Sequence, residues 1–236
     1  MQQRVLIIIP CYNEQIALPA VLDALQNITA FNISVVVVND CSKDGTAALV
    51  KDYSNVALID LPINLGIGGA MQTGYFYAVN NNFDIAIQLD GDGQHLPSEL
   101  HKLIDHHSAT GDNVVIGSRF LEQTAYKSSR SRRTGIYYFH LVNRLLLRRN
   151  IYDCTSGFRL FDKKALNIAA YNYPDEYPEP ESLVLFSQLG LKISEVPILM
   201  QERQGGSSSI GSISAIYYMV KVSIAMVFTY FRYLKK

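Results

Sequence analysis

The sequence predicts an α/β fold: a mostly parallel, twisted sheet with helices on both faces. Short apolar runs rich in β-branched residues alternate with segments of helical periodicity, the pattern of parallel strands joined by helices. A chain of 236 residues with 48% hydrophobic content suits one sizeable domain, or one domain with an appendage. Polar clusters follow several of the apolar runs. Because ligands bind beyond the carboxyl ends of parallel strands, these clusters predict a site at one edge of the sheet.

The first half of the chain supplies most of the predicted strands. The run 5–9 is apolar, β-branched and closed by Pro10, and the runs 35–38, 56–61 and 85–89 have the same character. Helical spacing over 16–25, 47–53 and 68–79 fills the intervals between them. A helix over 97–108 has Pro97 in its first turn. A fifth strand over 114–116 then ends at Gly117-Ser118-Arg119.

The pattern changes after Arg119. The polar, basic segment 128–133 predicts a loop, and 135–147 predicts a long apolar and aromatic helix. Helices over 164–169 and 182–189 and a strand over 192–196 follow. The segment 201–212, rich in Gly and Ser, suits either a lid over a ligand or a plain linker. We therefore expect a main domain over 1–209 and a C-terminal helix within 210–236.

Charge and cysteine content exclude several classes of protein. Lys and Arg number 21, as do Asp and Glu, so no overall field draws the chain to nucleic acid. The three cysteines, Cys11, Cys41 and Cys154, are odd in number and widely spaced. This argues for a reducing compartment and against a disulfide framework or a zinc site. The first residues have no signal-peptide pattern, so we expect no leader.

Residues 213–231 are strongly apolar and aromatic, are interrupted by Lys221, and precede Arg232 and two terminal lysines. The stretch is just long enough to span a bilayer, but a span would leave the basic tail on the outer side. We prefer an apolar, amphipathic helix lying in the membrane interface, with Lys221 reaching the surface. A helix packed against the domain or against a partner is the alternative.

The stretch Asp90-Gly91-Asp92-Gly93-Gln94-His95 follows the strand 85–89. Two carboxylates and an amide, spaced by glycines, give an oxygen-rich edge that suits Mg²⁺ or Mn²⁺ shared with substrate phosphates. A polar surface turn is the alternative, because Asp-Gly is a common turn pair. The polar clusters at the other strand ends favour the metal site.

The segment Gly66-Ile67-Gly68-Gly69 precedes the helix 68–79 and is not a dinucleotide-binding GxGxxG sequence. Its glycines either let a helix N-terminus approach a ligand or allow tight packing of helix on strand.

Several ordered motifs resemble those of family 2 glycosyltransferases of the GT-A fold. They are Pro10-Cys11-Tyr12-Asn13-Glu14, Asn39-Asp40 with the residues to Thr46, Asn64-Leu65-Gly66, Asp90 to His95, and Gly117-Ser118-Arg119. Asp153 to Phe161, Glu195-Val196-Pro197 and Arg203 narrow the resemblance to the polyprenyl-phosphate hexose synthases, the group of dolichol-phosphate mannose synthase and its bacterial undecaprenyl-phosphate relatives. The resemblance covers nearly the whole chain up to the last helix.

The resemblance implies a role for each matching residue. The donor nucleotide would be bound by Pro10, Tyr12, Glu14, Asp40, Gly66, Asp90 and Gly91. Asp92 and Gln94 would hold the Mg²⁺ or Mn²⁺ that bridges the donor diphosphate, and Arg203 would reach that diphosphate. Arg119 would face the acceptor phosphate.

Two further expectations come from the residues themselves. Arg132 and Arg133 lie in the basic segment after Arg119 and suit a lipid phosphate. Asp153 is either a catalytic carboxylate or a structural hydrogen-bonding group in the Ser156-Gly157 turn.

The resemblance also implies a departure. Members of the resembled family commonly carry a lysine shortly after the glycine that follows the arginine, where this chain has Ser207 to Ser209, so one cation at the diphosphate is missing or supplied elsewhere.

The function implied is inverting transfer of a hexose, glucose or N-acetylglucosamine, from a UDP-sugar to polyprenyl phosphate for cell-wall or surface polysaccharide assembly. The place implied is the cytoplasmic face of the cell membrane. A phosphate monoester is largely ionised at neutral pH, so this acceptor needs no dedicated general base. Three alternatives stay open: GDP-mannose as donor, a sugar hydroxyl as acceptor with Glu179, Glu181 or Asp153 as base, and a silent subunit that recruits a membrane partner. Whether the chain also binds a small membrane protein or a second copy of itself stays open.

Overall fold

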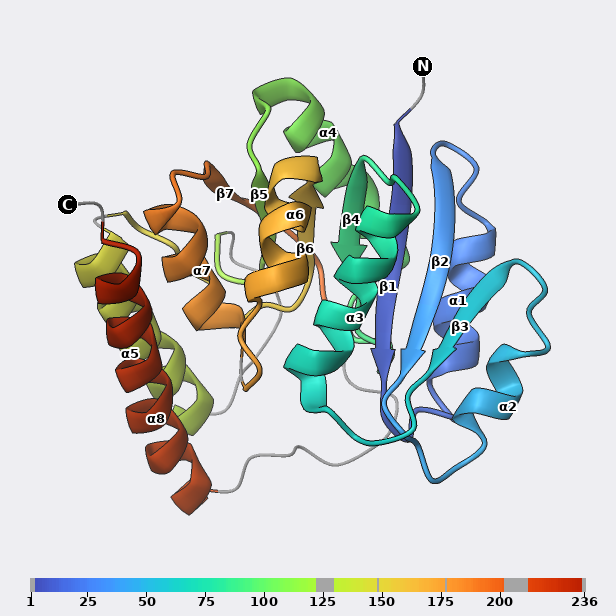
Figure 1. Ribbon diagram of the computed structural model, residues 1–236, viewed down its shortest axis with the longest axis horizontal. Helices are drawn as coiled ribbons and strands as arrows, with labels where there is room; N and C mark the ends of the chain where they lie inside the picture. The colour runs from blue at the N-terminus through green and yellow to red at the C-terminus, as the bar shows by residue number, and fades with distance from the viewer. Residues whose placement is uncertain (1–2, 122–129, 148, 177, 202–211, 235–236) are drawn as a thin grey trace.

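The computed structural model describes residues 3–121, 130–147, 149–176, 178–201 and 212–234. For 130–136, 212–216 and 218 it describes the backbone alone. The described residues form an α/β fold in which a central sheet lies between layers of helices (Figure 1).

Seven strands among the described residues form one sheet in the order β3-β2-β1-β4-β6-β5-β7. In chain order they are β1 (Arg4–Cys11), β2 (Asn32–Asn39), β3 (Val56–Asp60), β4 (Ile85–Gln88), β5 (Val114–Ser118), β6 (Arg159–Asp162) and β7 (Ile193–Pro197). Neighbouring strands are parallel except at β6, which is antiparallel to both β4 and β5. The predicted mostly parallel sheet is confirmed.

Helices cover both faces of the sheet, as predicted (Figure 1). One face carries α1 (Leu18–Gln26), α2 (Thr46–Val50) and α4 (Leu100–Thr110), which follows a short 3-10 turn, η1 (Pro97–Glu99). The other carries α3 (Gly66–Asn80), α5 (Arg130–Leu147), α6 (Lys163–Asn172), α7 (Pro178–Gln188) and α8 (Ser212–Arg232).

Strand β1 shows how the alternation of side chains divides the core. Val5, Ile7 and Ile9 pack in the layer of α1 and α4, while Leu6 and Ile8 pack in the layer of α3. All five are at most 1% exposed. Because both faces are covered, the strand is a continuous apolar run rather than an alternating one, which is why its sequence predicts it so well.

Three local predictions were wrong. The sequence did not predict β6, because its four residues carry too short a pattern. The segment 128–133 was predicted as a loop, but α5 begins at Arg130, so its basic residues continue into the helix. The helix predicted over 182–189 begins earlier, at Pro178, because proline is well tolerated in the first turn of a helix.

The C-terminal helix α8 lies beside α5 and packs on α7 (Figure 1). The Tyr138 hydroxyl and the Ser223 hydroxyl are 2.8 Å apart across the α5–α8 contact. Val222 and Met226 are buried in the same core as α3 and α7. On the side of α7, Lys221 forms an ion pair with Glu176.

The outer sides of these two helices expose a set of large apolar residues. The set comprises Tyr137, Leu141 and Leu145 of α5 and Tyr217, Val220, Ile224, Val227, Phe228 and Phe231 of α8. We call it the α5–α8 apolar face. Within the described part of the chain, no helix is both long enough and apolar enough to cross a membrane.

Candidate active site

The loops after β1 and β2 form one rim at the carboxyl edge of the sheet. The Asn13 amide N–H donates to the Ser42 hydroxyl at 2.9 Å, and the Lys43 N–H donates to the Asn13 side-chain oxygen at 2.8 Å. The Gly45 N–H donates to the Gln15 side-chain oxygen at 2.6 Å. These hydrogen bonds between the two loops hold Asn13 at a positive φ of 58° and fix the loops against each other.

The predicted donor-binding residues of the first motif lie on this rim. Pro10 lies near the end of β1 and is half-buried. Glu14 is half-buried in the loop that follows, and Tyr12 is 45% exposed. An exposed aromatic ring beside a half-buried carboxylate offers one surface for stacking on a base and one acceptor for hydroxyl groups.

Asp40 follows β2 and connects the rim to helix α3. Its Oδ1 accepts the Leu65 N–H at 2.6 Å and its Oδ2 accepts the Gly66 N–H at 2.9 Å. The carboxylate thereby satisfies two amides at the N-terminus of α3, where negative charge is favoured by the helix dipole. Gly66 has φ +75°, a backbone conformation that glycine adopts without strain.

The predicted metal turn follows β4, in the middle of the sheet. Asp92 is 7% exposed, and its Oδ1 accepts the Gln94 N–H at 3.0 Å. Gly91 lies against β1: a Cβ there would be 2.8 Å from the Cys11 sulfur. A side chain at Gly91 would therefore push this turn away from the neighbouring strand.

Asp90 is held among polar groups. Its Oδ2 lies 3.3 Å from Nδ1 of His95, whose ring stacks on Phe158. Burial alone would raise the pKa of Asp90, but His95, the charge of Arg119 and the Gln88 amide together hold that pKa below its usual range. Asp90 is thus kept as a carboxylate near neutral pH.

The donor set of this turn fits a hard divalent cation. Within the described residues, no group of three or more His, Cys, Asp or Glu side chains forms a metal cage. Mg²⁺ is commonly bound by one or two carboxylates together with substrate phosphates, so a complete protein cage is not required. Asp92 and Gln94 offer carboxylate and amide oxygens on one Gly-containing turn, in agreement with such a shared site.

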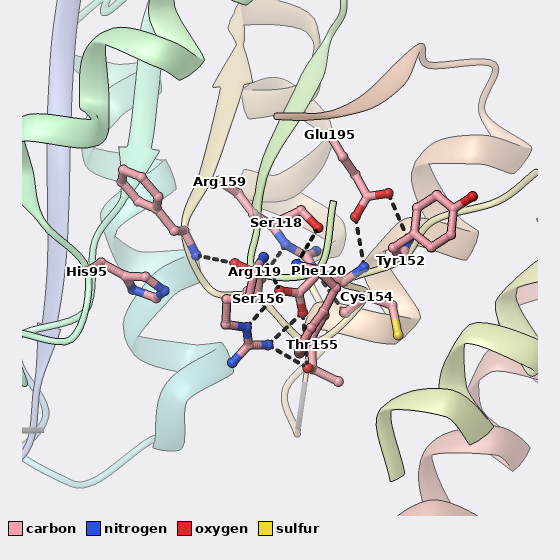
Figure 2. Close-up of polar contacts among 12 residues, drawn as sticks. His95, Ser118, Arg119, Phe120, Tyr152, Cys154, Thr155, Ser156, Arg159 and Glu195 are labelled. Carbon is pink, nitrogen blue, oxygen red and sulfur yellow. Dashed lines mark hydrogen bonds and ion pairs between the residues drawn. The ribbon is translucent and has the colours of Figure 1, made fainter. Parts of the chain in front are cut away.

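Arg119 and Asp153 form a buried ion pair. Arg119 Nε and Nη2 donate to Asp153 Oδ2 and Oδ1 at 2.7 and 2.6 Å, and the Arg119 backbone N–H donates to Oδ2 at 3.0 Å. Arg119 is 5% exposed and Asp153 is 0% exposed. The paired geometry fixes the guanidinium plane at the end of β5 (Figure 2).

Two residues that sequence reasoning did not single out hold the turn that carries Asp153. Glu195 on β7 accepts the Tyr152 and Asp153 amides, each at 2.7 Å. Arg159, which is 0% exposed, donates to the Ser156 carbonyl at 2.7 Å and to the Cys154 carbonyl at 2.8 Å. Figure 2 shows both side chains directed at the turn.

The two other acidic residues considered as bases face different surroundings. Glu179 is half-buried, and burial raises its pKa. The negative charge of Asp90 raises this pKa further, whereas the positive charge of Arg159 lowers it. Glu181 accepts the Thr229 hydroxyl of α8 at 2.7 Å. Glu179 therefore shares the electrostatic surroundings of Asp90, whereas Glu181 belongs to the α7–α8 contact.

Three predicted site residues cannot be placed by their side chains. Arg203 lies outside the described residues, and for Arg132 and Arg133 only the backbone, in the first turn of α5, is described. The Gln201 N–H donates to the Gln94 carbonyl at 2.9 Å, so the chain enters the segment 202–211 beside the predicted metal turn.

Comparison with known proteins decides the family. Residues 6–168 match the family described as glycosyl transferase family 2. The chain belongs to this family. The resemblance seen in its motifs is thereby confirmed.

Relatives of this family 2 chain extend over most of its length. It is 30% identical to a dolichyl-phosphate beta-glucosyltransferase of Trichomonas vaginalis, over 92% of the chain and 72% of the relative. It is 29% identical to a polyprenol monophosphomannose synthase of Mycolicibacterium smegmatis, over 94% of the chain and 86% of the relative. It is 31% identical to a UDP-N-acetylglucosamine–dolichyl-phosphate N-acetylglucosaminyltransferase of Methanococcus voltae, over 81% of the chain and 83% of the relative.

The fold of this family 2 chain is also that of solved glycosyltransferases. The crystal structure of glucosyl-3-phosphoglycerate synthase from Mycobacterium tuberculosis, in complex with Mn²⁺, UDP-glucose and phosphoglyceric acid, superposes with a TM-score of 0.71. It covers 99% of this chain and 81% of that one at 16% identity. The predicted GT-A fold is confirmed.

Proposed function

We propose that this chain is an inverting glycosyltransferase that moves a hexose from a UDP-sugar to polyprenyl phosphate. One observation carries the proposal: similarity along 81% to 94% of the chain to relatives named as transferases of glucose, mannose or N-acetylglucosamine to dolichyl or polyprenyl phosphate. Glucose or N-acetylglucosamine is our choice of sugar. GDP-mannose is the competing donor, because one of these relatives is a mannose synthase.

The reaction needs an oxygen nucleophile, an electrophilic C1 and a stabilised leaving group. A lipid phosphate, with a second pKa of about 6, supplies an ionised oxygen at neutral pH. That oxygen bonds to C1 from the face opposite the leaving group while the bond from C1 to the diphosphate breaks, and the nucleoside diphosphate departs with the electron pair. No proton has to be removed, so Asp153 is free to serve as the partner of Arg119 rather than as a base.

The donor diphosphate would lie at the Asp90–Gln94 turn. Asp92 and Gln94 would hold the Mg²⁺ or Mn²⁺, which when bound supplies positive charge to the leaving diphosphate. Arg203 stands two positions after Gln201, whose amide N–H donates to the Gln94 carbonyl, and we assign Arg203 to the same diphosphate. Asp40, Gly66 and the β1 rim would bind the nucleoside.

The acceptor would approach Arg119, with Arg132 and Arg133 as further cations for its phosphate. Association with the cytoplasmic membrane face would use the α5–α8 apolar face. Its exposed aromatic and aliphatic residues are of the kind that enter a bilayer interface, and the exposed Arg144, Arg149 and Arg232 suit anionic lipid headgroups.

A specific observation supports a second candidate function, transfer to a sugar hydroxyl. That reaction needs a general base. Glu179 is half-buried, interacts electrostatically with Asp90, and has a raised pKa. Burial is the main cause of this shift.

The proposal is tested with a panel of labelled UDP- and GDP-sugars, undecaprenyl phosphate and Mn²⁺. We expect a lipid-extractable labelled product from one UDP-sugar, and a fall of roughly 10²-fold or more for Asp92→Ala, the scale of losing a group that stabilises transition-state charge. Metal-dependent donor binding without any lipid product would instead favour a sugar hydroxyl as acceptor. Glu179→Gln would then abolish transfer to a sugar acceptor.

A further inference from the structure

The turn of residues 152–156 is held from two sides by opposite charges. On one side the Glu195 carboxylate accepts two successive amides, those of Tyr152 and Asp153. On the other side the Arg159 guanidinium donates to the carbonyls of Cys154 and Ser156. Each charged side chain takes the backbone groups that match its own hydrogen-bonding capacity, so the backbone of the turn has few alternatives.

The turn presents one carboxylate, Asp153, to Arg119. The two bonds from the guanidinium and the one from the Arg119 amide use both carboxylate oxygens. Thr155 adds a fourth contact, because its hydroxyl oxygen accepts Arg119 Nη2 at 2.9 Å. The orientation of Arg119 is therefore set by the turn rather than by β5 alone.

Glu195 closes a ring of contacts that returns to β5. β7 pairs with β5 in parallel register, with Glu195 opposite Ile116 and Pro197 opposite Ser118. Arg119 directly follows the end of β5 at Ser118. The contacts therefore run from β5 through Arg119, Asp153 and Glu195 to the neighbouring strand β7, and they fix all three side chains relative to the sheet.

We infer that Glu195 is a positioning residue for glycosyl transfer: it orients Asp153, and through Asp153 it aims the Arg119 guanidinium at the acceptor phosphate. The inference rests on the proposed function for the identity of the acceptor. The geometric part of the inference, that Glu195 fixes the orientation of the Arg119 side chain through Asp153, depends only on the hydrogen bonds described above. Glu195 itself touches backbone amides and not the reacting atoms.

The test uses Glu195→Gln and Glu195→Ala in the full chain. Glutamine keeps one carbonyl oxygen, but its amino group would face an amide donor, so one of the two bonds is lost; alanine loses both. A misplacement of about 1 Å at a reacting group costs roughly 10²-fold in rate. We expect the acceptor kcat/KM to fall roughly 10-fold for the Gln variant and 10²-fold for Ala, with the KM for the nucleotide sugar within about twofold of wild type.

The matched control is Asp162→Asn. Asp162 also accepts a backbone amide, that of Ala165 at 2.8 Å, but it pairs with Ile85 at the start of β4, the opposite edge of the sheet. The change removes one charge and keeps an acceptor at a helix N-cap, where Asn is as good as Asp. The second oxygen of Asp162 accepts Asn113 Nδ2 at 2.7 Å, so Asp162→Asn loses one of two hydrogen bonds, as Glu195→Gln does. We expect its donor and acceptor kinetics to equal those of wild type.

A second readout separates this inference from the proposed function. The Nε–H of Arg119, buried against Asp153, is followed by nitrogen-15 NMR and its hydrogen exchange. We expect faster exchange in both Glu195 variants and wild-type exchange in Asp162→Asn. If the wild type transfers no sugar to lipid phosphate, the proposed function fails while the exchange data still decide whether Glu195 sets Arg119.

Three results would overturn the inference. Wild-type exchange of the Arg119 Nε–H in Glu195→Ala would show that Glu195 does not set the guanidinium. Faster exchange with unchanged acceptor kinetics would show that the contact is structural only. A rise in the KM for the nucleotide sugar as large as the loss in acceptor kcat/KM, accompanied by a large fall in Tm, would also count against a positioning role.

Discussion

Three aspartates in the candidate site have separate physical tasks. Asp40 satisfies two amides of α3, Asp153 forms two bonds with the Arg119 side chain, and Asp90 sits 3.3 Å from His95. The sequence predicted all three as site residues, because each follows a strand or stands in a motif. It did not predict which group each one contacts, since those partners lie 5 to 34 positions away in the chain.

Glu195 and Arg159 show why part of the site was out of reach of sequence reasoning. A lone glutamate in a strand and a lone arginine before an apolar run have no local pattern that indicates their partners. Their roles arise because β5, β6 and β7 are neighbours in the sheet, which brings 152–159 beside 195. The Glu195-Val196-Pro197 segment was noted only as part of a resemblance.

A residue-scale prediction concerns the pH dependence of stability at Glu179. Burial raises its folded-state pKa above the ordinary value of 4.5. Its stabilising contribution is therefore complete below the unfolded pKa and is lost as pH rises through the folded pKa. We expect Glu179→Gln to gain in free energy of unfolding relative to wild type as pH rises from below 4.5 to neutral, measured by urea unfolding.

Asp44 is the comparison, because its pKa is shifted in the opposite direction to that of Glu179. Burial would raise its pKa, but hydrogen bonds from Thr46 and from the Gln15 amide lower it below 3.8. Its contribution is present above the unfolded pKa and is lost as pH falls through the folded pKa. Asp44→Asn should therefore lose stability relative to wild type at neutral pH and approach it in acid. Parallel curves of stability against pH for the two variants would show that at least one of the two pKa directions is wrong.

At the scale of elements, helix α3 connects the donor rim to the α6–α7 loop. The close approach occurs at Gly68, where a Cβ would lie 2.0 Å from the Asp175 carbonyl oxygen and 2.3 Å from that of Pro174. Both atoms belong to the backbone, so no side-chain rotation can relieve the overlap. Gly68 therefore allows close packing of α3, but against the loop at 174–175 and not against a strand as the sequence suggested.

We expect Gly68→Ala to destabilise the fold by about 1–3 kcal/mol or more, because the loop at 174–175 must move. Gly66→Asn is the control: nothing lies within 4 Å of a Cβ there, and Asn tolerates a φ of +75°. That variant should lose about 1 kcal/mol or less, because Asn adopts the left-handed region at a lower cost than other side chains. Equal urea midpoints for the two variants would mean that the loop yields without cost.

The sheet itself was predictable where strands are buried on both faces. β1, β2 and β4 each contain an apolar run without interruption, residues 5–9, 35–38 and 85–87, and this pattern alone identifies them. β6 was missed because its four residues gain their partners from β4 and β5, on either side of it in the sheet but distant in the chain. Strand order likewise depends on such long-range pairing and cannot be obtained from periodicity.

At the scale of the whole molecule, the layer formed by α3, α6 and α7 is extended by α5 and α8 (Figure 1). Helix α8 has two apolar sides: Val222 and Met226 are buried in the core, while Tyr217, Ile224 and Phe228 are exposed. A helix that serves only to cover a domain in water would have a polar outer side. The exposed side therefore supports the predicted position in a membrane interface.

The membrane prediction is tested by vesicle flotation with anionic lipid. Phe228 and Phe231 are 71% and 65% exposed, and transferring each ring from water is favourable by about 1.5–3 kcal/mol. We expect Phe228→Ser/Phe231→Ser to weaken vesicle binding by roughly 10²-fold, with sugar transfer to a short, water-soluble polyprenyl phosphate unchanged. The control Ile16→Ser/Ile63→Ser removes two exposed apolar side chains, 82% and 62% exposed, away from α5 and α8, and should bind vesicles as wild type does. Equal loss in both double variants would show that binding follows overall hydrophobicity and not the α5–α8 apolar face.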